Sequence, residues 1–358
     1  MTIRPLPSEF IKSTEIFETV VGRAEIELID LRKIKKILSG KKILITGAGG
    51  TIGSSVARRV LQSGHQDVYF LDRDESALHA LALSVSDKAA SHSEKCIVGD
   101  IKDLKGLNEI FRNLRPDLVI HAAALKHLVM LERFPREGFM TNIVGTRNVL
   151  EASKEFEVSQ FVNVSTDKAA FPKSFLGLTK RIGEIFTANG SDSKLTTSSV
   201  RFGNVFASRG SVIETFVHQI RQGIPVTITS EEVTRFFMSH QEAANLILSA
   251  ASLNENALFI QEMGEPVSIK RVIEVLARNL GKDFSLRVIG LQNGEKLHED
   301  LFDGEHEKTE FDTIHRVNAP RAEVNTEVFS HLLNPQSNSE ATENARTIAE
   351  YLNTKLEN

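Results

Sequence analysis

A glycine-rich turn between an apolar strand and a helix constrains this chain more than any other feature. Residues 43–46, ILIT, run straight into GAGGTIG at 47–53, and a helical pattern, SSVARRVLQSG, follows. Glycines at this spacing permit a tight turn, close approach of the backbone to a pyrophosphate, and tight packing of the helix on the strand. The order of strand, glycine turn and helix therefore predicts a dinucleotide-binding unit. Its expected contact residues are Gly47, Gly50, Thr51, Ile52 and Gly53.

Short apolar runs alternate with longer helical stretches from residue 41 to about residue 202. The runs are KKILIT, DVYFLD, KCIVGD, DLVIHAAA, QFVNVS and TTSSVRF. Strands separated by helices favour βαβ units, so we predict an α/β fold with a Rossmann-type, doubly wound parallel sheet. Around this domain, at 41–202, we expect an N-terminal helical extension at 1–40 and a smaller α+β region at 203–330 that mainly binds substrate. A polar linker and one surface helix are expected at 331–358.

Two carboxylates follow predicted strands at places where a dinucleotide needs them. Asp72 ends the second strand, where a carboxylate meets a ribose 2′-hydroxyl and repels a 2′-phosphate. Arg73 beside it would suit a 2′-phosphate, so NAD is favoured and NADP stays open. Asp100, after the third strand, is expected to reach the adenine amino group, and Ile101 to pack on the adenine ring.

Composition excludes several classes of protein. Lys and Arg total 43 and Asp and Glu total 47, which gives a formal net charge of −4 and argues against nucleic-acid or polybasic membrane binding. No apolar run approaches the roughly 18 residues that span a bilayer, and the N-terminus lacks the apolar core of a secretion signal. Cys96 is the only cysteine, and the histidines show no metal-ligand spacing, so we expect no disulfide and no metal site. These observations predict a cytoplasmic protein.

Several longer motifs resemble the extended short-chain dehydrogenase/reductases. They include HAAALKHLVMLERFPREGFMTNIVGT, VSTDKAAFPKSFLGLTKR, VRFGNVFASRGSVIETFVHQI, TSEEVTRFFMSHQEA and NGEKLHEDLF, and with the glycine turn they cover roughly residues 20–305 in the family's order. STDKA followed by a proline, RFGNV and SRGSVI are the more specific ones. They are similar to the UDP-N-acetylglucosamine 4,6-dehydratase branch, whose members make sugars for bacterial polysaccharides.

The resemblance implies a lyase reaction with internal hydride transfer. Hydride leaves sugar C4, water is eliminated across C5 and C6, and hydride returns to C6, in this case with inversion at C5. The resemblance assigns Asp167 as the acid for the C6 hydroxyl and Lys168 as the base for the C5 proton. Thr166 would hydrogen-bond the C4 hydroxyl, and Lys180 would hold the nicotinamide ribose. The family's usual tyrosine, four residues before that lysine, is Leu176 here, so the acceptor of the C4 proton is left open between Thr166, Asp167 and water.

The resemblance also implies binding residues. On the cofactor side these are Ala122, Ala123, Ala124, Lys126 and Asn142, the last of which supports the active-site helix in relatives. On the side of the UDP-sugar they are Lys126, His127, Arg201, Asn204, Ser211, Val212, Arg235 and Glu295. His121 is expected to pack beside the cofactor rather than to transfer protons.

Two other functions remain open from the sequence. One is a C4 epimerase or sugar reductase on the same fold, since fold does not fix function. Epimerases of this family rely on the tyrosine that is missing here. The other is a catalytically silent nucleotide-sugar-binding protein, which Leu176 favours and the intact Thr166, Asp167, Lys168 and Lys180 oppose. The family's closed assemblies predict a homo-oligomer, with the helix of residues 1–40 packing against a neighbour.

Overall fold

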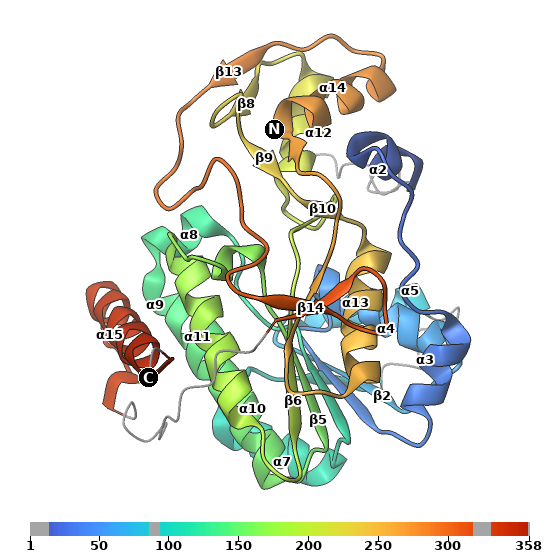
Figure 1. Cartoon of the computed structure of the whole chain (residues 1–358), viewed down its shortest axis with the longest axis vertical. Coiled ribbons are helices and arrows are strands. Elements are labelled where there is room, and N and C mark those ends of the chain that lie inside the picture. Colours follow the sequence, from blue (N-terminus) through green and yellow to red (C-terminus); the bar gives the residue numbers. More distant parts are fainter. Residues whose placement is uncertain (1–13, 86–93, 318–330, 357–358) are drawn as a thin grey trace.

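The computed structural model describes residues 14–85, 94–317 and 331–356. Its centre is a sheet in the order β14-β15-β11-β6-β5-β4-β1-β2-β3 (Figure 1). The strands from β3 through β11 run parallel, β15 pairs antiparallel with β11, and β14 pairs antiparallel with β15. The strands are β1 (Ile43–Thr46), β2 (Val68–Asp72), β3 (Cys96–Val98), β4 (Leu118–His121), β5 (Gln160–Val164), β6 (Thr196–Arg201), β11 (Leu258–Gln261), β14 (His306–Lys308) and β15 (Ile314–Val317). The predicted strands and their parallel pairing are confirmed.

Helices cover both faces of this sheet, which explains why its central strands read as continuous apolar runs. Successive residues of β1 point to opposite sides, so Ile43 and Ile45 join one core and Leu44 joins the other. The first core packs under α3 (Leu31–Leu38), α4 (Thr51–Gln62), α5 (Glu75–Val85) and α13 (His240–Leu253). The second packs under α7 (Leu104–Leu114), α8 (Leu128–Arg133), α9 (Pro135–Gly138), the π-helical turn η1 (Phe139–Val144), α10 (Gly145–Glu155), α11 (Phe175–Gly190) and α15 (Asn338–Leu356). The expected Rossmann-type, doubly wound fold is confirmed.

A smaller lobe with its own apolar core stands above the carboxyl end of the sheet (Figure 1). It contains α2 (Thr14–Val21), α12 (Val212–Gln222), β8 (Val226–Ile228), α14 (Ile269–Leu280) and β13 (Leu286–Val288), together with the short pairs β7 (Asn204–Val205) with β10 (Phe237–Met238) and β9 (Thr234–Arg235) with β12 (Val267–Ser268). Residues 203–330 do not all lie in this lobe, because α13, β11 and β15 belong to the central sheet and its helical layer.

The two ends of the described chain are tied to the body. Arg23, after α2, donates to the buried carboxylate of Glu242 at the start of α13. The C-terminal helix α15 packs on α11 and α9 through a buried apolar stripe of Ala341, Ala345, Ile348 and Leu352. The expected helix at this end is therefore present, with one face in the core. Residues 1–13 of the predicted extension lie outside the described residues.

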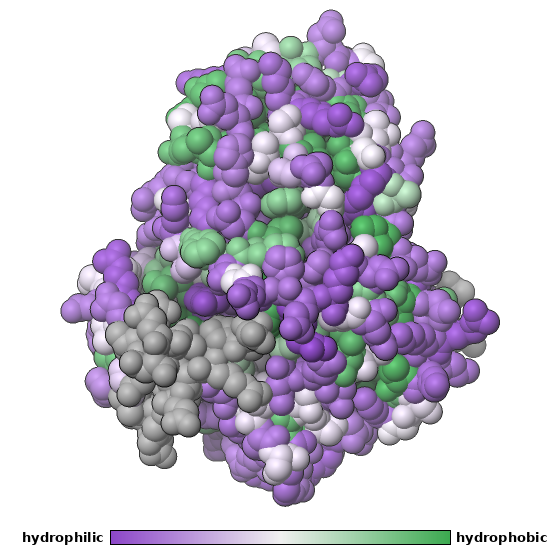
Figure 2. Space-filling view, viewed as in Figure 1, coloured by the Kyte–Doolittle hydropathy of each residue, from purple (hydrophilic) through white to green (hydrophobic). Residues whose placement is uncertain are grey.

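One irregular segment, residues 289–303, connects the lobe back to the sheet, and we call it the strap. It leaves β13 and returns at β14, passing the N-terminus of α11. Asn293 donates to Glu132, whose other oxygen accepts from the backbone N–H of Phe175, and Lys296 donates to the carbonyl oxygen of Ala170. Figure 2 shows a largely hydrophilic face, with hydrophobic side chains among those exposed where lobe and sheet meet. The strap thus brings the chain from the lobe back onto the turn that follows β5.

Candidate active site

The glycine turn forms a cradle that side chains would fill. Gly47 has φ +67°, and a β-carbon there would stand 2.6 Å from the Cα of Ala123. A β-carbon on Gly53 would stand 2.7 Å from the Cα of Ala48, so α4 can approach β1 this closely only with glycine. Helix α4 starts at Thr51 with no side-chain cap. Backbone N–H groups at such a helix start suit a pyrophosphate, so the cradle fits a dinucleotide.

The carboxyl ends of β2, β3 and β4 lie beside this turn, as the sequence predicts. Asp72 accepts hydrogen bonds from the backbone N–H of Gly49 at 2.9 Å and of Asp74 at 3.0 Å, so its carboxylate is fixed against the turn. Arg73 is exposed, and Ala122 and Ala123 follow β4 against Gly47. Asp100 accepts from the N–H of Lys102. Ile101 is 6% exposed and packs against Gly145 of α10 in the second core, and its packing on an adenine ring stays a prediction.

Asn142 is a buried support. It is 1% exposed, accepts from the N–H of Leu125 at 2.8 Å, and donates to the Leu125 carbonyl and the Thr179 hydroxyl, both at 3.0 Å. It therefore fixes the loop after β4 to α11, as the resemblance implies. A contact between Asn142 and the cofactor stays a prediction.

His121 is held as a neutral ring. Its Nδ1 lies 2.8 Å from the Thr46 hydroxyl and its Nε2 lies 3.0 Å from the Thr146 hydroxyl. Burial lowers the pKa of His121 to about 3, and the nearby charge of Lys180 acts in the same direction. The imidazole is thus uncharged at physiological pH, which agrees with a packing role.

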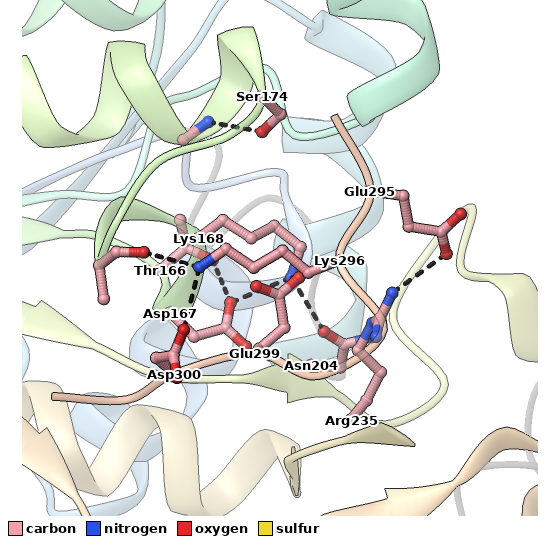
Figure 3. A network of polar contacts seen from close by, with 12 residues as sticks. Thr166, Asp167, Lys168, Ser174, Asn204, Arg235, Glu295, Lys296, Glu299 and Asp300 are labelled. Carbon is pink, nitrogen blue, oxygen red and sulfur yellow. Dashed lines mark hydrogen bonds and ion pairs between the residues drawn. The ribbon is translucent and has the colours of Figure 1, made fainter. Parts of the chain in front are cut away.

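The turn after β5 gathers the predicted acid and base. Asp167 is fully buried in the short 3₁₀ turn η2 (Asp167–Ala169), and its Oδ1 accepts from the Thr166 hydroxyl at 2.9 Å and from the Lys168 ammonium at 3.0 Å. The Lys168 Nζ also lies 3.4 Å from Oδ1 of Asn204 and 3.5 Å from Oε1 of Glu299 (Figure 3). Asp167 and Lys168 therefore lie side by side, and Asn204, expected on the side of the UDP-sugar, contacts Lys168 as well. Glu299, on the strap, joins them without having been predicted.

Lys168 keeps its charge more strongly than burial alone would allow. Burial lowers the pKa of Lys168, and the attraction of Asp167 and Glu299 outweighs burial, so the net pKa is raised. Arg235 opposes that attraction without reversing it. In this state Lys168 is an ammonium held between two carboxylates.

Helix α11 carries Leu176 and Lys180, one turn apart on one face. Leu176 is 5% exposed and packs in the apolar core. Burial lowers the pKa of Lys180 to about 8, while the charge of Glu184 raises it. The lysine can therefore switch charge near neutral pH, and its neighbour at 176 cannot titrate.

Arg201 does not take the position that its motif suggests. Its guanidinium is fully buried, bonds Glu184 at 2.7 and 2.6 Å, and bonds Asp303 at 2.7 and 3.1 Å. The carboxylate of Glu184 also accepts from Ser165. Arg201 is therefore the centre of an internal ion-pair network, and the expected phosphate contact is not supported by its geometry.

The other residues expected on the substrate side form two groups, one beside Lys168 and one at the loop 207–211. Arg235, on β9, pairs with Glu295 of the strap at 3.0 Å, beside the Lys168 cluster (Figure 3). The Lys126 ammonium donates to Ser208 at 3.2 Å, and a β-carbon on Gly210 would stand 3.0 Å from the ring of His127. Ser211 caps the start of α12 by position, and Val212 is 44% exposed. The loop at 207–211 also reaches the glycine turn, because the backbone N–H of Arg209 donates to Thr51 at 3.1 Å.

Sequence reasoning missed three carboxylates that organise this region: Glu184, Glu299 and Asp303. Glu299 and Asp303 lie in GEKLHEDLFD, four residues apart and following Glu295 at the same interval. That interval was a visible signal, although it did not identify the partner cations.

A family model described as polysaccharide biosynthesis protein matches residues 43–319. The chain belongs to this family. Its resemblance to the polysaccharide branch of the extended short-chain dehydrogenase/reductases is thereby confirmed. The capsular polysaccharide biosynthesis protein CapD of Staphylococcus aureus is 39% identical over 315 residues, which are 86% of this chain and 52% of CapD. A UDP-glucose 4-epimerase of Rickettsia rickettsii is 36% identical over 278 residues, covering 74% of this chain and 78% of that protein.

Among solved structures, the X-ray structure of Pen from Bacillus thuringiensis matches with a TM-score of 0.72 and 30% identity, over 78% of this chain and 88% of that one. This member of the family spans about half the length of CapD. Within the described residues, no helix is long and apolar enough to cross a membrane.

Proposed function

We propose that this member of the polysaccharide biosynthesis family is a nucleotide-sugar 4,6-dehydratase that acts on UDP-N-acetylglucosamine in the cytoplasm. The observation that carries the proposal is the buried Asp167–Lys168 pair at the end of β5, with Nζ and Oδ1 3.0 Å apart and Lys180 on the adjoining helix. A pair of this kind suits an elimination, which needs an acid and a base close together.

The cofactor in this proposal is a nicotinamide dinucleotide, NAD in preference to NADP. The Gly47–Gly53 cradle would hold the pyrophosphate, and Lys180 would meet the nicotinamide ribose. The Asp72 carboxylate would accept from a ribose hydroxyl and repel a 2′-phosphate. A bound nicotinamide would supply the hydride acceptor and donor that the reaction requires.

The Asp167–Lys168 pair can supply both partners of the elimination from one proton. Transfer of a proton from the Lys168 Nζ to the Asp167 Oδ1 converts the ion pair into a neutral amine and a carboxylic acid. The amine then takes the C5 proton, and the acid protonates the departing C6 hydroxyl, which leaves as water. Lys168 is an ammonium and Asp167 a carboxylate again, so the pair ends each elimination in its starting state. Thr166 would orient the C4 hydroxyl, and water would take the proton that this hydroxyl releases when hydride leaves C4.

A C4 epimerase is the second candidate, because a relative 36% identical bears that name. Leu176 alone does not separate the two candidates, because both must remove the C4 hydroxyl proton and a leucine in the core cannot accept it. The Asp167–Lys168 pair favours the dehydratase, because an elimination needs an acid and a base close together. The two candidates share the first oxidation at C4 and differ in the fate of the resulting ketone, which is either dehydrated or reduced from the opposite face.

Proton NMR of the purified protein with UDP-N-acetylglucosamine in deuterium oxide, without reductant, tests the proposal. A new C6 methyl signal with deuterium at C5 is expected. Lys168→Ala should abolish that signal, while Lys173→Ala, which removes an exposed lysine five residues on, should leave it intact. A C4 epimer without a methyl signal would establish the epimerase instead. If the sugar is unchanged, repeating the experiment with UDP-glucose and dTDP-glucose distinguishes another substrate from a silent binder.

A further inference from the structure

The strap brings a second carboxylate to Lys168. The side chain of Glu299 is 3% exposed, and its Oε1 lies 3.5 Å from the Lys168 Nζ. Its Oε2 is buried without a hydrogen-bond partner among the described residues, as is the Oδ2 of Asp167. Two buried carboxylates therefore share one ammonium, and each keeps an oxygen unsatisfied. A buried carboxylate with so few donors is costly unless a neighbouring cation stabilises it.

The charges around Lys168 come from each element that packs against it. The turn η2 contributes Asp167, the strap contributes Glu299, β9 contributes Arg235, and β7 contributes the neutral Asn204. Arg235 is itself paired with Glu295. Of the two anions, Asp167 is adjacent in sequence, while Glu299 arrives only when the strap is docked.

We propose that Glu299 is a positioning residue for Lys168: from the strap, it holds the Lys168 ammonium against Asp167 and keeps it charged until the elimination begins. The role of Lys168 in the elimination rests on the proposed function, whereas the effect of Glu299 on Lys168 does not. Glu299 acts through Lys168 and needs no contact with the sugar. The reason is geometric. The side chain of Lys168 is 19% exposed, whereas the side chains of Asp167 and Glu299, which hold its ammonium from the protein side, are 0% and 3% exposed.

The test measures how readily the Lys168 amine reacts, in the full chain and without any substrate. Trace acetic anhydride labels only neutral amines, and mass spectrometry of the Lys168 peptide gives its labelling rate against pH. Glu299→Gln removes one of the two anions, so the neutral fraction at pH 8 should rise and labelling should become about tenfold faster. The pKa of Lys168 falls in this variant. In a plot of turnover rate against pH, the part of the curve that follows the ionisation of Lys168 should therefore move to lower pH.

Asp300→Asn is the matched control. Asp300 is the next residue of the strap, its side chain is 56% exposed, and it pairs with Lys296 rather than Lys168. This variant should label Lys168 at the wild-type rate. Glu299→Asp keeps the charge and should also stay close to wild type, which separates charge from opening of the strap.

Equal labelling of Lys168 in wild type and Glu299→Gln would overturn the proposal. The proposal would also fail if Glu299→Asp or Asp300→Asn labelled Lys168 as fast as Glu299→Gln does, because increased access and not lost charge would then explain the faster labelling. None of these outcomes depends on which sugar the enzyme takes, so failure here is distinguishable from failure of the proposed dehydratase activity.

Discussion

Gly177 lets helix α11 rest directly on the turn that carries Lys168. A β-carbon at this position would stand 3.1 Å from the carbonyl carbon of Lys168, closer still to its oxygen, and 3.2 Å from Pro172. The obstacle is backbone, which cannot rotate away as a side chain can. Gly177→Ala therefore requires the helix and the turn to separate by about 1 Å to restore ordinary contact.

Such a separation moves Lys180, on the helix, relative to Asp167 and Lys168, on the turn. A misplacement of about 1 Å can cost roughly 100-fold in rate, and overpacking of this kind costs about 1–3 kcal/mol of stability. We expect Gly177→Ala to lower kcat for methyl formation in the NMR assay by about 100-fold. Urea unfolding should show the accompanying loss of stability.

Gly183→Ala is the control on the same helix. Its nearest neighbours would be 3.8 Å away, an ordinary contact, and alanine favours a helix interior over glycine by up to about 1 kcal/mol. This variant should be at least as stable as wild type and nearly as active. If Gly177→Ala matched Gly183→Ala in both assays, the contact between α11 and the turn would not govern the site.

Three further predictions concern the core of the site. Arg201→Ala leaves Glu184 and Asp303 without their buried partner and should lower the free energy of unfolding in urea by about 3–5 kcal/mol. Arg209→Ala, at an exposed arginine, should change it little. Unchanged stability of Arg201→Ala together with weakened UDP-sugar binding would restore the phosphate role of Arg201. Lys180→Met removes a buried ammonium whose pKa of about 8 lies below its ordinary value. Because the unfolded chain then binds more protons than the folded one between about pH 8 and 10.5, wild-type stability rises with pH there. The melting temperature of Lys180→Met should thus exceed that of wild type at pH 7, the gap should narrow toward pH 10, and a constant gap would contradict the buried charge. Gly53→Val should lose bound dinucleotide in an absorbance or mass measurement while the chain still folds, and retention of the cofactor would show that α4 need not approach β1 so closely.

The features that sequence predicts well here are local ones. The glycine turn, the six strands from β1 to β6 and the acid–base turn each occupy a short continuous stretch whose pattern follows from sterics and burial. Asp72 and Lys180 reach the site because they end a parallel strand or lie one helical turn from a motif position. In such cases the fold class fixes where the residue goes.

The features that sequence misses depend on partners far away in the chain. Arg201 looks like a phosphate ligand because an arginine that pairs with carboxylates inside the protein is the same residue type as one that binds phosphate. Only the arrival of Glu184 from α11 and Asp303 from the strap distinguishes the two. The sequence shows Glu299 as one of three carboxylates at a repeated spacing, but it does not show that Lys168 is the cation that Glu299 contacts.

Three ion pairs hold the strap against the site. Its carboxylates at 295, 299 and 303 pair with Arg235, Lys168 and Arg201, three cations from three different strands or turns. Opening the strap would leave Lys168 with one anion and would strip Arg201 of Asp303 inside the protein. Breaking a buried pair from one side costs about 3–5 kcal/mol, which is too much to repeat in every catalytic cycle without compensation. Under the proposed function we therefore expect the strap to stay docked during turnover and the substrate to approach Lys168 from the solvent-exposed part of its side chain.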